Sequence, residues 1–243
     1  MAMHQPSSGT GDNLFAGEPI SVREGIPVFL GEVDGNNRRY QTMYDRIAIA
    51  YDAAERIGGW IVRQFRNARR EFVAELELPA GATVLEVSIG TGANVPYLPA
   101  DARIFGLDLS WGMLRRCRRN LRKWHRDAEL CQGEAERLPY RDAVFDSVFH
   151  IGGINFFNDR AAAIREMIRV ARPGAKIVIS DEMEKVVRNF YARMPFVRHY
   201  FKNRTEPVVN PVDLVPPGMA QIRTKEIIGG RLYVLSFRKP AAG

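Results

Sequence analysis

Val84-Leu85-Glu86-Val87-Ser88-Ile89-Gly90-Thr91-Gly92-Ala93-Asn94 is the stretch of this 243-residue chain that decides its fold. An apolar run of strand length leads directly into a turn that carries two glycines, Gly90 and Gly92. Because glycine has no Cβ atom, the backbone of such a turn can approach a bound ligand closely. In doubly wound sheets, ligands bind at the carboxyl ends of the strands. We therefore expect a ligand site at this turn.

Strand and helix patterns alternate along the chain after this stretch. The expected strands cover residues 83–87, 103–107, 128–132, 144–150 and 175–180, and the expected helices cover residues 112–125 and 159–171. Parallel strands need crossover connections, so this alternation predicts an α/β fold with a doubly wound, mostly parallel sheet. Residues 220–228 and 231–238 flank Gly229-Gly230, a spacing typical of a tight hairpin. We therefore expect a seven-stranded sheet with a final antiparallel strand.

The chain is long enough for one large domain with short additions. Residues 1–13 are polar and rich in Gly and Ser, which predicts a disordered tail, and residues 14–38 predict an extended arm. Helical periodicity begins at Arg39 and continues through two helices to Leu76, ahead of the first expected strand. Residues 39–243 form the predicted domain, in which the aromatic and proline-rich segment 183–219 is expected to be a lid.

Composition excludes several classes of protein. The chain is 46% hydrophobic and 26% charged, with 21 Gly and 14 Pro, which fits a globular protein and excludes collagen-like, coiled-coil and wholly disordered chains. Two cysteines, Cys117 and Cys131, cannot form a disulfide framework, so we expect core thiols and a cytoplasmic location. The longest apolar stretches fall well short of the ~20 residues that cross a bilayer, which leaves only peripheral membrane contact.

The chain is basic, with a formal net charge of +7, and 29 of its 35 basic residues are arginines. Seven basic residues lie within RRCRRNLRKWHR at positions 115–126. A solvated helix face is the favoured interpretation, because a surplus of seven charges over the whole chain is modest for a nucleic-acid-binding protein. A patch for RNA or anionic lipid is the alternative.

Two acidic residues indicate the chemistry of the ligand. Asp108 ends the second expected strand, 22 residues after Glu86, where a carboxylate can accept hydrogen bonds from both ribose hydroxyls of an adenosine group. Glu86 lies at the glycine turn, where its charge would repel the pyrophosphate of a dinucleotide and attract a cation. No lysine of the P-loop type follows the turn. S-adenosylmethionine, which carries an ammonium and a sulfonium group and no phosphate, fits this pattern.

A series of motifs resembles the class I S-adenosylmethionine-dependent methyltransferases. The series comprises residues 84–94 as the first motif, 106–110 with the second-strand acid, 132–139 as the segment beside adenine, 145–150 as the fourth strand and 169–175 as the turn before strand five. Within that class, residues 44–52 and 153–159 are similar to the ubiquinone and menaquinone biosynthesis C-methyltransferases. The resemblance covers roughly residues 40–182, and Ser88 stands where the first motif usually has glycine.

This resemblance implies a Rossmann-like methyltransferase fold that binds S-adenosyl-L-methionine and releases S-adenosyl-L-homocysteine. The implied cofactor-binding residues follow the matched motifs and the helix before them: Tyr51, Glu86, Ser88, Gly90, Gly92, Asn94, Asp108, Leu109, Glu134, Ala135 and His150. The implied methyl acceptor is a small, hydrophobic molecule that is quinone-like, a phenol, a thiol or an amine.

His150 and Tyr44 are the candidate catalytic residues. His150 ends the fourth expected strand, where an imidazole can take a proton near neutral pH, and contact with the cofactor alone is the safer interpretation. Tyr44 lies seven residues before Tyr51 on the same helix face, either as a core aromatic or with a hydroxyl that reaches cofactor or substrate. The sequence contains no recognisable cluster of metal ligands.

Two classes of function stay open. The first is a small-molecule methyltransferase, and the second is a protein that binds S-adenosylmethionine without methyl transfer, or an RNA methyltransferase or RNA-binding module. The intact glycine turn and Asp108 favour the first class, which makes nucleic acid the less favoured partner. Peripheral membrane contact and a dimeric state are both compatible with the sequence.

Overall fold

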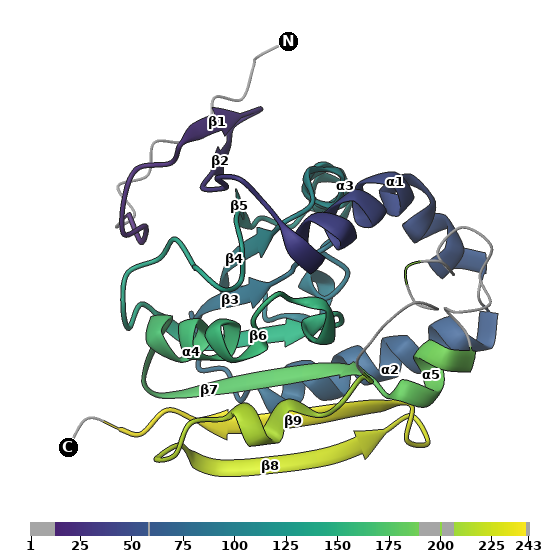
Figure 1. Cartoon of the computed structure of the whole chain (residues 1–243), viewed down its shortest axis with the longest axis vertical. Helices are drawn as coiled ribbons and strands as arrows, with labels where there is room; N and C mark the ends of the chain where they lie inside the picture. Colours follow the sequence, from purple (N-terminus) through teal and green to yellow (C-terminus); the bar gives the residue numbers. More distant parts are fainter. Residues whose placement is uncertain (1–12, 58, 190–199, 201–206, 242–243) are drawn as a thin grey trace.

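The computed structural model describes residues 13–57, 59–189, 200 and 207–241, and leaves the side chains of 47 and 49–66 undescribed. A nine-stranded sheet runs through the molecule in the order β1-β2-β5-β4-β3-β6-β7-β9-β8 (Figure 1). The seven strands after the first hairpin are β3 (Thr83–Val87), β4 (Arg103–Asp108), β5 (Glu129–Gln132), β6 (Phe145–Ile151), β7 (Ala171–Glu182), β8 (Ala220–Ile227) and β9 (Leu232–Arg238).

The strand directions confirm the predicted fold class. Strands β5, β4, β3, β6 and β7 are parallel neighbours, and β9 lies between β7 and β8 and is antiparallel to both. The carboxyl ends of the parallel strands therefore meet at one edge of the sheet, where β3 leads into the glycine turn. The strand count differs from the expected seven because β1 (Ser21–Arg23) and β2 (Ile26–Val28) add a hairpin.

This N-terminal hairpin extends the sheet at β5. Val28 of β2 pairs in parallel with Gln132 of β5, and the amide of Phe29 donates a hydrogen bond of 2.8 Å to the Gln132 carbonyl. Figure 1 shows the hairpin at the opposite end of the sheet from β8 and β9. The expected extended arm is thus an edge of the same sheet.

The tight two-residue hairpin expected at Gly229-Gly230 is wrong. Ile227 pairs with Leu232, so four residues, 228–231, connect β8 to β9. Ile228 has a φ of 52°, followed by 60° at Gly229 and 71° at Gly230. The turn therefore starts one residue before the glycines, with an isoleucine in the left-handed region that a β-branched residue rarely adopts.

Five α-helices are described, namely α1 (Gly35–Ile57), α2 (Gly59–Glu75), α3 (Trp111–Trp124), α4 (Arg160–Val170) and α5 (Glu184–Asn189). Ser110 and Asp159 are the N-cap residues of α3 and α4, and their side chains accept hydrogen bonds from the amides of Met113 and Ala162. The glycine turn is followed by a single 3₁₀ turn, η1 (Val95–Tyr97). Further 3₁₀ turns are η2 (Ile154–Phe156) and η4 (Pro211–Leu214).

Helices cover both faces of the sheet. Alternate residues of a strand point to opposite faces, and accordingly Leu85 and Val87 pack in one buried cluster with α4, while Val84 packs in another with α2 and α3. A third, smaller buried cluster joins α1, η2 and α5, and it contains Tyr40, Met43, Phe156, Val187, Tyr200 and Val208. This apolar cluster brings the segment after β7 against α1.

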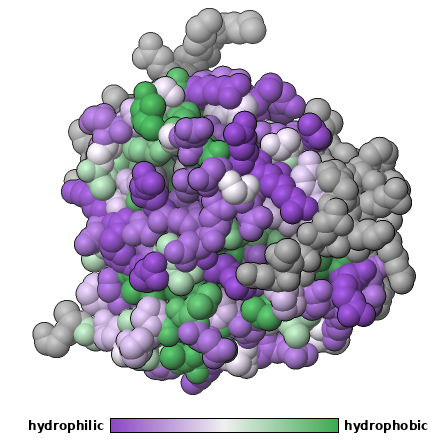
Figure 2. Space-filling model, in the orientation of Figure 1, coloured by the Kyte–Doolittle hydropathy of each residue, from purple (hydrophilic) through white to green (hydrophobic). Residues whose placement is uncertain are grey.

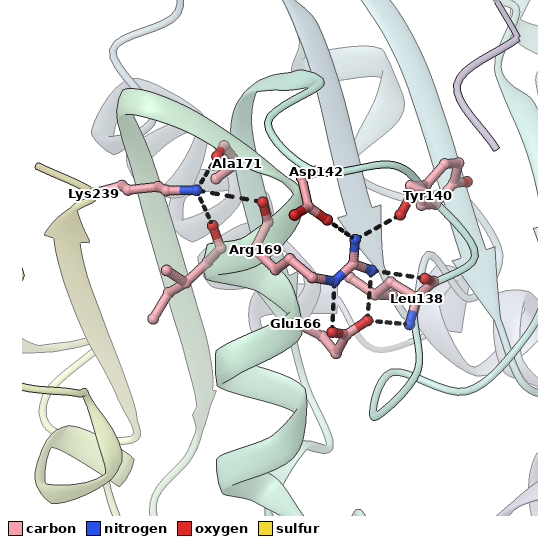
Figure 3. A network of polar contacts seen from close by, with 8 residues as sticks. Leu138, Tyr140, Asp142, Glu166, Arg169, Ala171 and Lys239 are labelled. Carbon is pink, nitrogen blue, oxygen red and sulfur yellow. Dashed lines mark hydrogen bonds and ion pairs between the residues drawn. The ribbon is translucent and has the colours of Figure 1, made fainter. Parts of the chain in front are cut away.

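A network around Arg169 ties the loop after β5 to α4 (Figure 3). Its guanidinium donates to both carboxylate oxygens of Glu166 at 2.7 Å, to the carbonyls of Leu138 and Tyr140 at 2.9 and 2.8 Å, and to Asp142 at 2.7 Å. Hydrogen bonds that involve charged groups are the stronger ones, so this fork fixes the path of residues 138–142. The loop that leaves β5 is therefore anchored at its far end.

The surface view in Figure 2 shows a mainly hydrophilic face with small, separate hydrophobic areas. Among the described residues, the large hydrophobic side chains that are exposed are Ile20, Val22, Val209 and Ile222. None of the described helices combines the length and the hydrophobicity that a bilayer crossing requires.

Candidate active site

The turn after β3 has the backbone geometry of a ligand-binding loop. Ser88, Gly90 and Gly92 all have positive φ angles, of 61°, 56° and 77°. A Cβ atom on Gly92 would lie 2.8 Å from the Cys117 sulfur, whereas one on Gly90 would meet nothing closer than 4.0 Å. Gly92 therefore permits close packing on α3, and Gly90 leaves open space beside the turn. Ser88 adopts the left-handed conformation of the glycine that it replaces, at a cost of about 1 kcal/mol.

Asp108 connects this turn to the start of α3. One carboxylate oxygen accepts a hydrogen bond of 2.8 Å from the amide of Gly90, and the other accepts one of 2.8 Å from the amide of Ser110. Burial raises the pKa of Asp108 to about 6, against the opposing effect of these two hydrogen bonds. Each carboxylate oxygen has further acceptor capacity, so Asp108 can still receive hydroxyl groups of a ligand.

Glu86 is the second buried acid, and it is only 1% exposed. Asn94 donates a hydrogen bond of 2.6 Å to its Oε1 atom, and its Oε2 atom has no partner among the described residues. Burial raises the pKa of Glu86 to about 8, with Asn94 opposing the shift. A carboxylate in this environment is stabilised by a cation, so the site favours a positively charged ligand group.

The segment expected beside adenine contacts the start of α1. The Asn37 amide donates hydrogen bonds of 3.1 Å to Glu134 and of 3.1 Å to Glu136, and Ala135 between them is buried in the core. Neighbouring Leu109 offers its carbonyl oxygen to the side chains of Gln41 and Gln132, at 3.1 and 2.9 Å. These contacts surround the carboxyl ends of β4 and β5 with polar groups from α1.

A further residue that the sequence did not reveal, Asp45, holds α1 against α3 at this edge. Its Oδ1 atom accepts hydrogen bonds from the Ser110 hydroxyl at 2.5 Å and from the Gly112 amide at 2.8 Å. A Cβ atom on Gly112 would lie 3.0 Å from the Asp45 Cα atom. The available signal in the sequence was Gly112 itself, because a glycine inside the first turn of a helix costs stability and so indicates a close approach of another part of the chain.

The structure brings Tyr44 to the carboxyl end of β6, the strand that ends near His150. Tyr44 packs against the third cluster, and its hydroxyl oxygen lies 3.8 Å from where a Cβ atom of Gly153 would be. Tyr51 lies in the same helix, but its side chain is outside the described residues. Of these two tyrosines, the structure therefore describes the side chain of Tyr44 near the expected site and not that of Tyr51.

His150 is completely buried at the end of β6, beside the end of β3. Its Nδ1 atom lies 2.9 Å from the Val87 carbonyl oxygen, and its ring packs edge-on against Phe157 at 5.2 Å between centroids. A carbonyl oxygen only accepts, so Nδ1 carries the proton. Nε2 has no hydrogen-bond partner among the described residues. Burial lowers the pKa of His150, so the imidazole is neutral at neutral pH.

Asn155, within a motif that resembled the quinone enzymes, has a structural role. Its amide nitrogen donates to Asp181 at 3.1 Å and to the Tyr233 hydroxyl at 3.3 Å, while its oxygen accepts from Arg160 and from the Val209 amide, both at 3.1 Å. Every polar atom of this side chain is thus bonded within the protein. Asn155 and Asp181 fix the loop after β6 and the segment at residue 209.

The remaining expectations have mixed outcomes. Arg118 of α3 binds Glu24 of the hairpin and Arg126 donates to the Leu98 and Pro99 carbonyls, so the basic helix face is only partly solvated. Cys117 and Cys131 are buried free thiols, as expected. The expected lid at 183–219 includes residues 190–199 and 201–206, which lie outside the described residues. Within the described ranges, no cluster of His, Cys, Asp and Glu could hold a metal ion.

The central part of the chain is similar to a known protein family. Residues 85–179 match the family model described as a methyltransferase domain. This segment is therefore similar to methyltransferase domains. Its glycine turn, Asp108 and His150 all lie inside the matched range, whereas α1 and the segment after β7 lie outside it.

Curated proteins are also similar to this chain over more than half of its length. The demethylmenaquinone methyltransferase of Renibacterium salmoninarum is 34% identical over 140 residues, which are 57% of this chain and 56% of that protein. The chain covers less than two thirds of the length of the curated relatives that it matches first.

Solved structures share the fold of this chain at low sequence identity. The (4+2) cyclase SpnF superposes with a TM-score of 0.68 and 16% identity over 88% of this chain and 100% of that one. Phosphoethanolamine N-methyltransferase 2 of Haemonchus contortus, solved in complex with S-adenosyl-L-methionine, has a TM-score of 0.65 and 15% identity over 86% of this chain and 60% of that one. Because one of these proteins is named for a cyclisation, the fold by itself does not define the reaction.

Proposed function

We propose that this protein transfers the methyl group of S-adenosyl-L-methionine to a small, hydrophobic, quinone-like acceptor and releases S-adenosyl-L-homocysteine. The relatives named as demethylmenaquinone methyltransferases support the quinone-like acceptor. The similarity of residues 85–179 to methyltransferase domains supports the reaction class.

The observation that carries this proposal is the pairing of two buried acids at one glycine turn. Glu86 keeps an unpartnered Oε2 atom among the described residues, and Asp108 accepts the Gly90 amide at 2.8 Å. Both are at least 90% buried, where an uncompensated anion is costly. S-adenosylmethionine offers what each acid lacks, an ammonium group for Glu86 and ribose hydroxyls for Asp108. The residues present therefore fit this cofactor.

The cofactor, when bound, supplies a methyl group that is already activated by a sulfonium. The protein then has to bind the cofactor and the acceptor, orient them and exclude water. Positioning can account for most of the acceleration of such an in-line displacement. Glu86, Ser88, Gly90, Gly92 and Asn94 would line the methionine side of the cofactor. Asp108, Leu109, Glu134 and Ala135 would line the adenosine side, with Tyr51 and the His150 ring as further contacts.

Calorimetry with the full chain tests the cofactor, and a transfer assay tests the reaction. We expect S-adenosylmethionine and S-adenosylhomocysteine to bind in the micromolar range and NAD and ATP to bind more weakly. We also expect methyl-labelled S-adenosylmethionine to label 1,4-dihydroxynaphthalene, a minimal reduced naphthoquinone. Tighter binding of NAD or ATP would contradict the cofactor assignment, and cofactor binding without label transfer to any quinol, phenol, thiol or amine would favour a binding protein.

An RNA-directed function is the second candidate, because Arg115, Arg119, Arg122 and Lys123 of α3 are exposed. Four cations on one helix face attract phosphate groups. A peripheral contact with an anionic membrane would use the same charges. The cytoplasmic location and the dimeric state stay predictions.

A further inference from the structure

The N-terminal arm (residues 14–38) borders the loop that leaves β5, which is the segment expected beside adenine. At one end of this loop, the backbone amide of Phe29 donates a hydrogen bond of 2.8 Å to the Gln132 carbonyl. At the other end, the backbone amide of Ala16 donates one of 2.8 Å to the Pro139 carbonyl. The arm therefore contacts the loop at both of its ends, and a side chain of the arm contacts the middle.

That side chain belongs to Asn37, at the start of α1. Its amide nitrogen donates hydrogen bonds of 3.1 Å to Oε1 of Glu134 and of 3.1 Å to Oε1 of Glu136, and its oxygen accepts from the Asn158 backbone amide at 3.2 Å. Because the two acids need a donor and the backbone amide needs an acceptor, the orientation of the Asn37 amide group is determined. Asn37 is only 4% exposed. A buried amide thus holds two carboxyl groups of the loop in place.

The start of α1 is itself fixed, so Asn37 is a rigid support. The side-chain oxygen of Asn158, in the loop before α4, accepts hydrogen bonds from the backbone amides of Asn36 and Asn37 at 2.7 and 3.3 Å. Amides in the first turn of a helix have no partner within the helix, and Asn158 satisfies two of them. A Cβ atom on Gly35 would lie 2.5 Å from this oxygen, so the approach requires glycine.

Glu134 lies next to the acid that is expected to bind ribose. Gln132 pairs with Asp108 across β5 and β4, and the backbone amide of Gly133 donates a hydrogen bond of 3.2 Å to the Asp108 carbonyl. Glu134 follows directly and is partly exposed. A carboxylate accepts several hydrogen bonds, so the bond from Asn37 leaves Glu134 able to accept from a ligand.

A fixed carboxylate can distinguish between purine bases. Adenine carries a 6-amino group, which donates hydrogen bonds, whereas hypoxanthine carries an oxygen at the same position, which accepts them. A carboxylate that is held in place accepts from the amino group and repels the oxygen. A carboxylate that is free to rotate would turn away from the oxygen at little cost. Selection of the base therefore depends on the group that holds the acid.

We infer that Asn37 is a positioning residue that orients Glu134 toward the 6-amino group of the cofactor's adenine, so that the N-terminal arm determines the choice of base. This inference rests on the proposed function, in which Asp108 binds the ribose and Glu134 lines the adenosine side. Asn37 lies outside the range 85–179 that matches the methyltransferase family model. The matched range thus contains the acid, and the arm supplies its support.

Calorimetry on the full chain with two matched ligands tests this inference. S-inosylhomocysteine differs from S-adenosylhomocysteine in carrying an oxygen in place of the 6-amino group. We expect wild type to bind S-adenosylhomocysteine at least about tenfold more tightly, because the hydrogen bond to a charged acceptor is lost and two oxygens face each other. Asn37→Ala should reduce this preference to roughly threefold or less, because Glu134 can then rotate.

Two further variants make the test specific to the side chain of Asn37. Asn37→Asp has nearly the same size but replaces the donor with a third carboxylate, so it should reduce the preference at least as much as Asn37→Ala does. Asn36→Ala is the matched control, because Asn36 is exposed and contacts Asn158 through its backbone amide. It should keep the wild-type preference.

Glu134→Gln tests the same contact from the other side. A glutamine amide can donate to the oxygen of hypoxanthine, so this variant should bind S-inosylhomocysteine more tightly than wild type does and S-adenosylhomocysteine more weakly. A residue that only supports the fold would not change the two affinities in opposite directions.

Several results would overturn the inference. Equal binding of the two ligands by wild type, or parallel losses for both in Glu134→Gln, would reject base selection by Glu134. A wild-type preference in Asn37→Ala, or loss of the fold in both Asn37 variants, would make Asn37 a residue of the fold alone. Each of these results leaves the proposed cofactor intact, whereas failure of wild type to bind S-adenosylhomocysteine would instead reject the proposed function.

Discussion

The side-chain amide of Asn94 donates a hydrogen bond of 2.6 Å to Glu86, so the end of β3 is linked to the start of the 3₁₀ turn that follows the glycines. This bond uses Oε1 only, and Oε2 has no partner among the described residues. The arrangement holds the carboxyl group in one orientation without neutralising it. A buried acid that is oriented but uncompensated gives the site a pH dependence that can be measured.

Glu86 should make the stability of the ligand-free protein fall between about pH 4.5 and pH 8. Its pKa in the folded state is raised by burial to about 8 from 4.5, so the folded protein binds this proton more tightly than the unfolded chain does. The stabilisation is complete below the unfolded pKa and is lost as the pH rises through the folded one. Each pKa unit corresponds to about 1.4 kcal/mol, so the loss amounts to a few kcal/mol.

Urea unfolding of wild type and Glu86→Gln across this range measures the effect. The variant should lose the pH dependence above pH 6, where Asp108 with its pKa of about 6 has largely titrated. Affinity for S-adenosylmethionine should rise with pH in wild type and stay flat in the variant, because a cationic ligand binds the ionised carboxylate. Parallel slopes in the two proteins would rule out Glu86 as the titrating group.

Replacing Asp108 should separate ribose binding from support of the turn. Asp108→Asn keeps one oxygen acceptor but loses the charge, and a hydrogen bond to a charged group is worth roughly 1.5 to 3 kcal/mol, so affinity for S-adenosylhomocysteine should fall at least about tenfold. An analogue without ribose hydroxyls should lose less affinity than S-adenosylhomocysteine does, because it senses only the effect of the variant on the turn. Calorimetry gives both values, with exposed Asp127→Asn as the control.

Asp108→Ala should destabilise the fold more than Asp108→Asn, which loses the acceptor for only one of the two backbone amides. The amides of Gly90 and Ser110 would both lose their acceptor, at a cost of about 1 to 3 kcal/mol for each buried unpaired group. Thermal unfolding should therefore rank wild type first and Asp108→Ala last. If the alanine variant were as stable as wild type, the role of Asp108 in holding the turn would be refuted.

Local patterns in the sequence were sufficient to predict the parallel strands and the acids at their ends. β3 and β6 are apolar runs bounded by turn residues. Glu86 and Asp108 are recognisable because each is an acidic residue near the carboxyl end of an apolar strand. The four-residue turn at Ile228 was missed because an isoleucine with positive φ has no local signal. The two strands of the N-terminal hairpin were not predicted as part of the sheet, because their pairing with β5 involves residues more than 100 positions apart.

The helix contacts around the site escaped prediction for the same reason. Asp45 and Ser110 are separated by 65 positions, and Asn37 and Glu134 by 97. Such polar pairs depend on how α1 packs across the sheet edge, which no spacing along the chain encodes. His150 was found from its place at a strand end, but the unpartnered state of Nε2 needed the geometry of the Val87 contact.

The Arg169 network should contribute measurably to stability. Arg169→Lys retains a positive charge but cannot reproduce the forked hydrogen bonds to Glu166 and to the two carbonyl groups. We expect the free energy of unfolding to fall by about 2 kcal/mol, since these charge-assisted bonds are partly buried. Arg165→Lys, on the exposed side of the same helix, is the matched control and should change stability little. An equal effect of both changes would show that the fork is unimportant.

Asp45 should couple the docking of α1 to cofactor affinity. Asp45→Ala removes the acceptor for the Ser110 hydroxyl and the Gly112 amide, and Ser110 is also the residue whose amide binds Asp108. We expect several-fold weaker binding of S-adenosylhomocysteine and faster hydrogen exchange at the start of α3. Asp45→Asn retains an oxygen acceptor and should show a smaller effect. Unchanged exchange in the alanine variant would mean that α1 docks independently of this contact.

Charge reversal on α3 separates a small-molecule enzyme from a nucleic-acid-binding protein. Arg119 and Arg122 are exposed, whereas Arg115 lies 3.8 Å from Glu24, so the first two are the better sites for a change that spares the fold. Arg119→Glu combined with Arg122→Glu should leave cofactor affinity and methyl transfer to 1,4-dihydroxynaphthalene unchanged, because α3 packs on the sheet through Leu114, Cys117 and Leu121.

Binding of mixed-sequence RNA to the same pair of proteins completes this test. If the basic face of α3 is only solvated, wild type should bind RNA no more tightly than non-specific proteins do, with dissociation constants of about 10⁻⁴ to 10⁻⁶ M that weaken steeply with salt. The double variant should bind still more weakly. A nanomolar, salt-resistant complex in wild type that the two substitutions abolish would instead make RNA the partner and displace the small-molecule acceptor from the proposed function.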